Sequence, residues 1–437
     1  GVIVQYGGQT PLKLVNDLAK FKVPIIGTSP ASIDAAEDRE KFQKILKDID
    51  VLQPANGTAR NKNQALKKAD DIGYPIIVRP SYVLGGRAME VIYDSSELKK
   101  YINEAVKVSN DAPVLIDKFL NEAIEIDVDA IRDKKGEVYI AGIMQHIEEA
   151  GVHSGDSACS IPTYSINKTQ LNHIKKNTIK MANKLNVLGL MNVQFALKDK
   201  KLYVIEVNPR ASRTIPFVSK SIGVSVAKIA AKCMLGETLK KINPPKERKS
   251  KYFNVKEVVF PFLKFPGADP ILSPEMKSTG EVMGTGKTFE EAFAKSQIST
   301  SIEIPSSGNA FISVKNEDKK NINVIAKKLI QLGFNLVATD GTQLYLNKNK
   351  IKCQRVNKVR EGRTHIVDMI KNKEIDLIIN TTQNKQAIKD SYLIRREALQ
   401  QKVYYTTTIA GANALVGAIA HSKNLKVYKL QNIFKLA

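Results

Sequence analysis

Glu206 and Asn208 stand two residues apart in an apolar stretch, a spacing that places two oxygen ligands side by side. On a strand, alternate residues face the same way, so both side chains project to one side while Ile205 and Val207 enter the core. Gln194 can join them from an adjacent predicted strand. One carboxylate and two amide oxygens suit Mg²⁺ and leave positions for phosphate oxygens. Taken alone, Glu206 also fits an ordinary exposed strand residue.

Arg79 ends a second apolar stretch and is followed by a loop that contains Gly85 and Gly86. Two glycines let backbone N–H groups approach an anion closely, which is the layout of a flap over phosphates. A Gly-Gly pair by itself is more often an ordinary turn. The arginine and the loop together therefore predict a phosphate contact.

A polar, glycine-rich stretch follows Glu148 and contains His153, Ser154, Asp156 and Ser157. It is too polar to pack a core. Side chains of these types suit hydrogen bonds to ribose or phosphate, although His153 also fits a surface loop. A catalytic triad is not indicated, because no GxSxG string is present.

The string from Gly280 to Thr288 looks like a phosphate-binding P-loop, with Gly286, Lys287 and Thr288 at its end. The first glycine of GxxxxGK[ST] would fall at Glu281, so the pattern fails by one position. The string also follows no convincing buried strand, and we reject it as the nucleotide site.

The elements that must position these residues alternate between strands and helices from Tyr74 to about Leu239, which predicts an α/β or α+β core. The first residues read as a β-α-β pattern, with strands at 2–4 and 23–26 around a helix at 11–21, and a charged helix follows at 32–46. The further predicted strands are 75–79, 89–93, 114–119, 125–132, 138–148, 191–198 and 202–207.

A Pro-Ser-Ser-Gly cluster at 305–308 precedes a last region in which strands again alternate with helices. This periodicity predicts a small Rossmann-like α/β domain. Its predicted strands are 310–314, 335–338, 343–346, 377–380 and 403–405.

The bulk composition places the chain among globular proteins of two or three domains, since 437 residues exceed what one core normally organises. No apolar run approaches the ~20 residues of a membrane span. The first ten residues lack a secretory signal, and the start looks cut from a longer chain. Three widely spaced cysteines suggest neither disulfides nor a zinc site, so a reducing cytoplasm fits best.

A net charge of +23 raises the possibility of nucleic-acid binding. The lysines are scattered over solvent-face positions without the interleaved aromatic residues that base stacking uses. We therefore expect no nucleic-acid partner.

Nearly the whole chain resembles the second synthetase half of the carbamoyl phosphate synthetase large subunit. The resemblance is carried by VQYGGQTPLKL, GTSP, AEDREKF, RPSYVLGGRAMEV, EEAGVHSGDSACSIP, GLMNVQFA, IEVNPRASRTIPFVSK and VFPFLKFPGADPILSPEMKSTGEVMG. It implies an ATP-grasp fold followed by a Rossmann-like, methylglyoxal-synthase-like domain. The implied domains are a remnant of a pre-ATP-grasp domain (1–36), the ATP-grasp domain (37–240), the end of the synthetase module with a connection (241–301) and the allosteric domain (302–437).

The resemblance implies a ligase that phosphorylates carbamate with MgATP (or MnATP) to give carbamoyl phosphate and ADP, the final step of a synthesis that serves the pyrimidine and arginine pathways. Arg79, Arg210 and Arg213 would be catalytic, the last two near the carbamate. The implied ATP contacts are Arg39, Arg79, Lys118, Leu120, Glu125, Gly151, Val152, His153, Ser154, Gln194 and Glu206. Gln194, Glu206 and Asn208 would hold the divalent ions.

The same resemblance makes the last domain regulatory, with a nucleotide effector bound by Thr339, Lys358, Asn380 and Thr382. Methylglyoxal synthesis would need a carboxylate base, and the Thr-Thr-Gln-Asn segment after Asn380 offers none. The family's large subunit also carries an earlier synthetase half, works with a glutaminase small subunit and forms oligomers of the full enzyme. Since the earlier half is absent from this sequence, activity of the chain alone is in doubt.

Two other functions stay open from the residues alone. ATP-grasp features also suit a biotin-dependent carboxylase, although the strings PSYVLGGRAMEV and NPRASRTIPFVSK favour the synthetase. A non-catalytic nucleotide-binding subunit is the second alternative. The presence of Gln194, Glu206 and Asn208 together argues against it.

Overall fold

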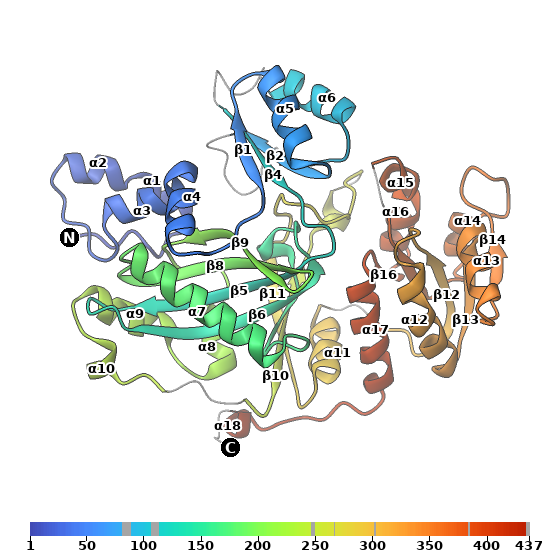
Figure 1. Ribbon diagram of the computed structural model, residues 1–437. Coiled ribbons are helices and arrows are strands. Elements are labelled where there is room, and N and C mark those ends of the chain that lie inside the picture. Colours follow the sequence, from blue (N-terminus) through green and yellow to red (C-terminus); the bar gives the residue numbers. More distant parts are fainter. Residues whose placement is uncertain are drawn as a thin grey trace.

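The structure, a computed structural model, describes residues 1–80, 89–105, 113–245, 250–265, 267–300, 303–382 and 385–433. The predicted loop with Gly85 and Gly86 lies outside these ranges, and so does the expected boundary at 301–302. Within the described residues, every helix is too short or too polar to span a lipid bilayer. In Figure 1 a broad central sheet separates the N-terminal helices from the C-terminal domain.

Residues 1–48 form short helices, and the predicted strands at 2–4 and 23–26 are reduced to one parallel bridge between Val2 and Ile25. The predicted helix 11–21 is split at Leu14, and the predicted helix 32–46 is split at Asp38. Asp38 is extended, and its carboxylate accepts the Lys41 N–H, so it caps a new helix whose first residue is Arg39. The helices are α1 (Gln9–Lys13), α2 (Val15–Lys20), α3 (Pro30–Glu37) and α4 (Arg39–Asp48).

A small lobe follows, in which an antiparallel sheet of order β1-β4-β2-β3 packs against two helices. Alternate residues of β2, such as Ile76 and Val78, are fully buried, while Arg79 is only partly buried. The elements are β1 (Asn56–Ala59), α5 (Lys62–Ile72), β2 (Ile76–Pro80), β3 (Glu90–Ile92), α6 (Ser95–Ala105) and β4 (Val114–Lys118).

The central sheet has the order β11-β10-β7-β6-β5-β8-β9 and pairs its strands antiparallel throughout. Its strands are β5 (Ile124–Arg132), β6 (Val138–Glu149), β7 (Cys159–Ile161), β8 (Gly189–Lys198), β9 (Lys201–Asn208), β10 (Phe253–Val259) and β11 (Gly280–Gly286). Helices cover it: α7 (Lys168–Lys184), α8 (Ile215–Ile222), α9 (Val226–Met234), α10 (Leu239–Ile242) and α11 (Phe289–Ser299). Short 3₁₀ turns lie at Ser154–Asp156 and Phe262–Lys264.

The C-terminal domain is a parallel sheet of order β14-β13-β12-β15-β16, which is the doubly wound order expected of a Rossmann-like fold. The strands are β12 (Gly308–Ser313), β13 (Phe334–Thr339), β14 (Gln354–Val356), β15 (Leu377–Asn380) and β16 (Tyr404–Thr406). The helices are α12 (Lys319–Gln331), α13 (Asp340–Lys348), α14 (Ile366–Lys371), α15 (Lys385–Asp390), α16 (Tyr392–Gln400), α17 (Ile409–Ser422) and α18 (Leu430–Ile433).

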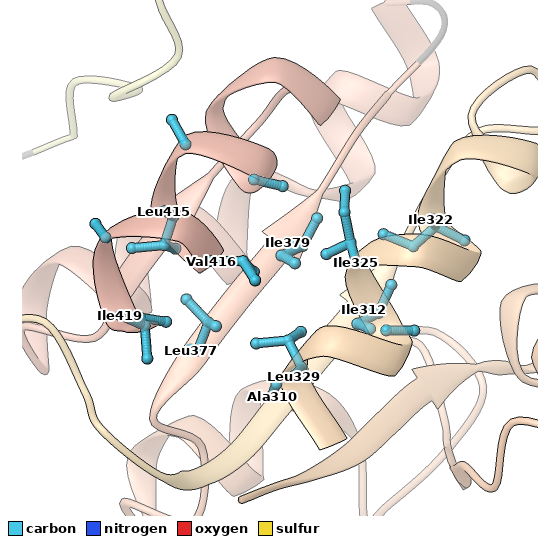
Figure 2. Packing of buried hydrophobic residues seen from close by; sticks show 14 of the residues in the cluster. Ala310, Ile312, Ile322, Ile325, Leu329, Leu377, Ile379, Leu415, Val416 and Ile419 are labelled. Carbon is cyan, nitrogen blue, oxygen red and sulfur yellow. The ribbon is translucent and has the colours of Figure 1, made fainter. Parts of the chain in front are cut away.

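Both faces of this parallel sheet are covered, as such sheets require. On one face, Ala310 and Ile312 pack under α12, whose Ile322, Ile325 and Leu329 recur at helical spacing (Figure 2). The same cluster takes in Leu415, Val416 and Ile419 of α17 and also Phe289 and Phe293 of α11. The C-terminal domain therefore shares a core with helix α11, which also packs against the central sheet.

The predicted strand at 343–346 is wrong, because this segment lies in helix α13. Its buried residues, Thr342 and Leu346, are four apart and fit a helical period. The third strand of the sheet is instead β14, which ends at Val356.

Candidate functional site

Gln194 on β8 lies directly opposite Glu206 on β9, and the Asn208 amide donates a 2.8 Å hydrogen bond to Glu206 Oε1. The three predicted metal ligands are therefore adjacent. The pairing has a β-bulge between Gln194 and Phe195, and Ile205 has no partner in the register. Ile205 is 39% exposed, so its predicted place in the core is wrong, while Val207 is buried as expected. Bulges of this kind re-aim side chains next to functional sites.

Arg210 extends this group, because one guanidinium nitrogen donates to Asn208 Oδ1 at 3.1 Å and another to the Ala211 carbonyl at 3.1 Å. Burial lowers the pKa of Arg210, and the Glu206 and Glu37 carboxylates oppose that shift. The buried Nε of Arg210 has no hydrogen-bond partner among the described residues. This N–H is available to an anion.

Arg39 from α4 and Arg79 from β2 form the second half of the site. Arg39 is paired with Asp117 of β4. Burial and the nearby Arg79 charge lower the pKa of Arg39 to about 10, against the effect of Glu206. In the described part of the chain, the buried Nε of Arg79 also lacks a partner. Two neighbouring arginines whose charges repel each other are typical of a site that binds phosphate.

Glu125 stands next to the loop that begins at Gly151, whose N–H donates to Glu125 Oε2 at 3.4 Å. Burial raises the pKa of Glu125 to about 7. Gly151 has φ +107°, and a Cβ there would meet the Phe119 ring at 2.6 Å, so only glycine fits. Leu120 packs against Ala123, Ala150 and Ala196 beside it. Four of the predicted ATP contacts therefore lie close together: Leu120, Glu125, Gly151 and the following Val152.

The predicted ATP contact Lys118 is directed elsewhere. Its Nζ donates to the carbonyls of Gly73 at 2.9 Å and Tyr74 at 2.8 Å, in the connection between α5 and β2. Burial lowers the pKa of this amine. In this structure Lys118 holds this connection against the end of β4.

His153 and Ser154 lie in the turn that follows Gly151. His153 Nδ1 accepts the Gly155 N–H at 3.0 Å, and the His153 N–H donates to the Ser273 carbonyl at 2.9 Å. Burial lowers the pKa of His153, with Arg213 acting in the same direction and Asp156 opposing it. A neutral imidazole is therefore favoured, with Nε2 left to act as a donor.

Arg213 contacts the sulfur of Met276. The loop that carries Arg213 is held in place by residues that were not predicted from the sequence. The fully buried Asp129 accepts hydrogen bonds from Thr214 Oγ1 at 2.7 Å and from Asn192 Nδ2 at 3.0 Å. Asp129 thereby fixes the loop of Arg210 and Arg213 to β5 and β8.

His146 was also missed, although it is buried between two carboxylates. Its Nε2 lies 3.0 Å from Asp127 Oδ2, and its Nδ1 lies 3.8 Å from Glu125 Oε1. Burial opposes protonation, but the Asp127 hydrogen bond and the Glu125 charge outweigh it and raise the pKa of His146. The signal was in the sequence, since Glu125, Asp127 and Asp129 alternate along one strand and must share a face.

Gln5, a further missed residue, joins the N-terminal helices to the site. It is fully buried, and its amide donates to the carbonyls of Pro209 at 2.8 Å and Leu190 at 3.3 Å. Its backbone carbonyl accepts the Ala211 N–H at 2.8 Å. Nothing in its local sequence marks this role.

A separate polar group lies where β12, β13 and β15 end. Ser313 Oγ and Thr339 Oγ1 share a 3.0 Å hydrogen bond, and Asn380 Nδ2 donates to the Ser313 carbonyl at 3.3 Å. Asn380 Oδ1 is buried and has no partner in the described ranges. The predicted Thr339 and Asn380 are thus brought together beside Thr382, whereas Lys358 is exposed on the loop after β14. Ser313 was missed because its strand was judged only by its apolar residues.

The first site can bind a polyanion and a cation. The Glu206 carboxylate acts on the charges of both Arg39 and Arg210, and the charge of Arg79 acts on Arg39. Across the described residues, no three histidine, cysteine, aspartate or glutamate side chains gather as metal ligands. A cation here would therefore rest on Glu206, on amide oxygens and on the ligand's own phosphates.

Comparisons with known proteins agree with this chemistry. Residues 38–242 match the family model "Carbamoyl-phosphate synthase L chain, ATP binding domain", and residues 321–407 match the "MGS-like domain" model. The chain is 58% identical over 433 residues to a carbamoyl phosphate synthase large chain of Pseudomonas syringae pv. tomato, covering 99% of this chain and 40% of that protein. It is 55% identical over 440 residues to that of Xanthomonas axonopodis pv. citri, covering 100% and 41%.

Among solved structures, the fold is similar to biotin carboxylase from Campylobacter jejuni, with a TM-score of 0.56 and 18% identity over 68% of this chain and 73% of that one. The biotin carboxylase domain of 2-oxoglutarate carboxylase from Hydrogenobacter thermophilus gives a TM-score of 0.52 at 18% identity, over 64% and 69%. At this identity the likeness shows the ATP-grasp fold alone. The chain spans about 40% of the length of the curated relatives it matches.

Proposed function

The chain belongs to the family of carbamoyl phosphate synthase large chains, and on that premise we propose that its ATP-grasp domain phosphorylates carbamate with ATP to give carbamoyl phosphate and ADP. The observation that carries the proposal is the group around Glu206. There, one carboxylate faces two amide side chains, and Arg210 offers a buried N–H that has no partner within the described ranges.

Each part of this group has a task in phosphoryl transfer. Such reactions need little covalent work from the protein, so positioning and charge neutralisation supply most of the rate enhancement. Arg39 and Arg79 would bind the phosphates of ATP, while Arg210 and Arg213 would hold the carbamate. Leu120, Glu125 and the turn at 151–154 would enclose the adenosine. Lys118 would act indirectly, by holding the connection between α5 and β2 in place.

The donor set at Gln194, Glu206 and Asn208 fits Mg²⁺ or Mn²⁺, since all three offer hard oxygen atoms. When bound, such an ion would neutralise charge on the transferred phosphoryl group. In the present arrangement Asn208 Oδ1 also accepts a hydrogen bond from Arg210.

The reverse reaction tests the proposal without handling unstable carbamate. The chain is incubated with carbamoyl phosphate, Mg²⁺ and ADP, and ATP formation is followed. We expect ATP to appear, and to be lost in Arg210→Ala, while Arg355→Ala serves as a surface control because its pair with Asp340 is exposed. ATP consumption that depends on bicarbonate and biotin, with no reverse reaction, would instead identify a carboxylase.

We further propose that the C-terminal domain binds a phosphorylated nucleotide effector at the ends of β12, β13 and β15, through Thr339, Lys358, Asn380 and Thr382. Asn380 Oδ1 supports this, because it is buried, has no partner among the described residues and so offers an acceptor to a ligand. Calorimetric titration of the full chain with UMP and IMP should show binding of at least one, weakened in Lys358→Ala. Absence of heat with either nucleotide contradicts the proposal.

Several further properties follow from the family and are proposed on that basis. The remaining length of the relatives would supply the earlier synthetase half, and a glutaminase small subunit would supply ammonia. We propose that the full enzyme is an oligomer in the cytoplasm. We also propose that the domains end at residues 36, 240 and 301.

A further inference from the structure

Residues 267–278, which we call the strap, run between the C-terminal domain and the turn at 151–157. They belong to the connection between β10 and β11. At one end the strap is held by helix α16, and at the other by the loop that contains His153.

The first end is held by residues three and four apart on one side of α16. Tyr392 OH donates to the Gly267 carbonyl at 2.9 Å, and Arg396 donates to the Ala268 carbonyl at 3.3 Å. Arg395 forms a two-pronged ion pair with Asp269, in which its Nε lies 2.8 Å from Oδ1. Positions i, i+3 and i+4 lie on one helical face, so α16 contacts the strap through one face.

Arg395 is buried, and its charge is balanced by Asp269, so this ion pair is the strongest contact between α16 and the strap. Removing one partner of a buried ion pair leaves an uncompensated charge, so such pairs hold their geometry strongly. An open cavity of about 370 Å³, lined by Phe262, Phe265, Ala268 and Asp269 among others, lies beside the strap. Apolar packing is therefore incomplete here, and the ion pair carries the contact.

The second end is held by Asp156, which is fully buried. Its two carboxylate oxygens accept the N–H groups of Lys277 at 2.7 Å and Ser278 at 2.9 Å. Ser278 Oγ donates to the Gly155 carbonyl at 2.9 Å, and the His153 N–H donates to Ser273 at 2.9 Å. The strap thus fixes the backbone of the turn on both sides of Ser154.

Arg395 also contacts the effector side of the C-terminal domain. Its second guanidinium nitrogen donates to the Ile388 carbonyl in α15 at 2.8 Å, and α15 follows the turn that contains Asn380 and Thr382. Asp390 of α15 pairs with Arg360, two residues from Lys358, at 3.3 Å. Both proposed effector-binding segments are therefore tied to α15, and α15 is tied to the strap through Arg395.

We propose that Arg395 and Asp269 are positioning residues that hold the nucleotide turn 151–157 through the strap and pass the state of the effector site to it. The proposal rests on the proposed function for its regulatory part. Movement of α15 changes the Ile388 contact of Arg395, and the strap carries that change to His153 and Asp156. The strap therefore affects the binding of ATP rather than the chemical step.

The direct test is hydrogen exchange of the full chain, which requires neither activity nor a known effector. Asp269→Asn keeps the size of the side chain and removes the charge, and Tyr392→Phe removes one exposed hydroxyl with little risk to the fold. We expect exchange at the amides of His153, Lys277 and Ser278 to become about 10-fold faster in Asp269→Asn and less so in Tyr392→Phe. Arg355→Ala, which breaks an exposed arginine–aspartate pair of the same domain, should leave these amides unchanged.

Unchanged exchange at these three amides in both strap variants overturns the proposal. A second measurement separates positioning from general destabilisation: in the full enzyme, Asp269→Asn should raise the KM for ATP about 10-fold and leave kcat within a few-fold. An equal fall in kcat at constant KM also overturns it. If UMP and IMP bind neither wild type nor variant, the effector site fails while the exchange result on the strap stands. If they bind both equally but shift the KM for ATP only in wild type, the transmission is supported.

Discussion

Glu206 organises the charge of the proposed ATP site. Burial alone would lower the pKa of Arg39 and Arg210 further, and the Glu206 carboxylate opposes this for both. It also accepts the Asn208 amide and lies opposite Gln194. One side chain therefore serves the arginines, the amides and any bound cation.

Glu206→Gln should reduce Mg²⁺-dependent phosphoryl transfer at least about 100-fold, because it removes the carboxylate of the proposed metal set. The fold should persist, since Gln keeps the size of the side chain and an oxygen for Asn208. ATP formation from carbamoyl phosphate and ADP, at saturating Mg²⁺, measures the effect. Glu237→Gln is the matched control, as Glu237 pairs only with surface lysines among the described residues. Activity of Glu206→Gln within a few-fold of wild type would contradict the assignment.

Glu148 and Glu257 are buried carboxyl groups outside this site, and burial raises their pKa to about 7 and about 8. Glu257 accepts hydrogen bonds from Gln297 and from the Val258 N–H, and Gln297 in turn accepts from Tyr404. Because these folded-state pKa values lie above the unfolded value of about 4.5, folding favours the protonated forms.

Stability contributed by these two groups is therefore full below about pH 4 and is lost as the pH rises to about 8. We expect the thermal midpoint to fall across this interval by more in wild type than in Glu257→Gln, whose side chain cannot ionise. Differential scanning calorimetry over a pH series measures both slopes. Parallel slopes in the two proteins would show that Glu257 stays ionised when folded.

At the scale of elements, regular strands were predictable and interruptions were not. The strands that carry Arg79, Glu125 and Gln194 were located within two residues, since apolar alternation marks a half-buried strand. The exposure of Ile205 was not predictable from the sequence, because the bulge at this position depends on the partner strand β8. The break at Asp38 depends on one capping hydrogen bond, which competes weakly against a long helical pattern.

The rejected P-loop string illustrates how an element can be explained only by its neighbours. Gly284 and Gly286 lie on β11, and a Cβ at either one would overlap the backbone of α11 near Ala292. These glycines let a helix cross a strand at close range, which is a packing role. No phosphate loop forms, because the whole string up to Gly286 is paired with β10.

Gly284→Ala should destabilise the fold by about 1–3 kcal/mol, the usual cost of overfilling a packed contact. Gly280→Ala on the same strand is the control, since its Cβ would find only Val259 at 4.0 Å. Urea unfolding of both variants gives the comparison. Equal stability of the two would mean that α11 does not press on β11 as described.

At the scale of the whole molecule, the two main units are joined by more than a linker. Phe289 and Phe293 of α11 belong to the core of the C-terminal domain, and Lys315 of that domain pairs with Glu122 beside Leu120 at 2.9 Å. A fragment that begins near Pro305 would lack α11 and expose this core. The sequence predicted both folds but could not reveal the shared core, because such contacts join residues far apart in the chain.

The net charge of +23 is the remaining property of the whole molecule, and we predict that it does not reflect a nucleic-acid-binding function. Several described arginines already have partners within the protein, among them Arg39 with Asp117, Arg132 with Asn183 and the Val187 carbonyl, and Arg395 with Asp269. What remains is mostly lysine, which binds phosphates only as a mobile point charge. Any basic protein gives weak, salt-steep binding to DNA, so binding at low salt is uninformative. At physiological salt, affinity for duplex and single-stranded DNA and RNA should be no tighter than the ~10⁻⁴ to 10⁻⁶ M of non-specific contacts. Sequence-selective, submicromolar binding in a fluorescence-anisotropy titration would show instead that the lysines form a functional surface.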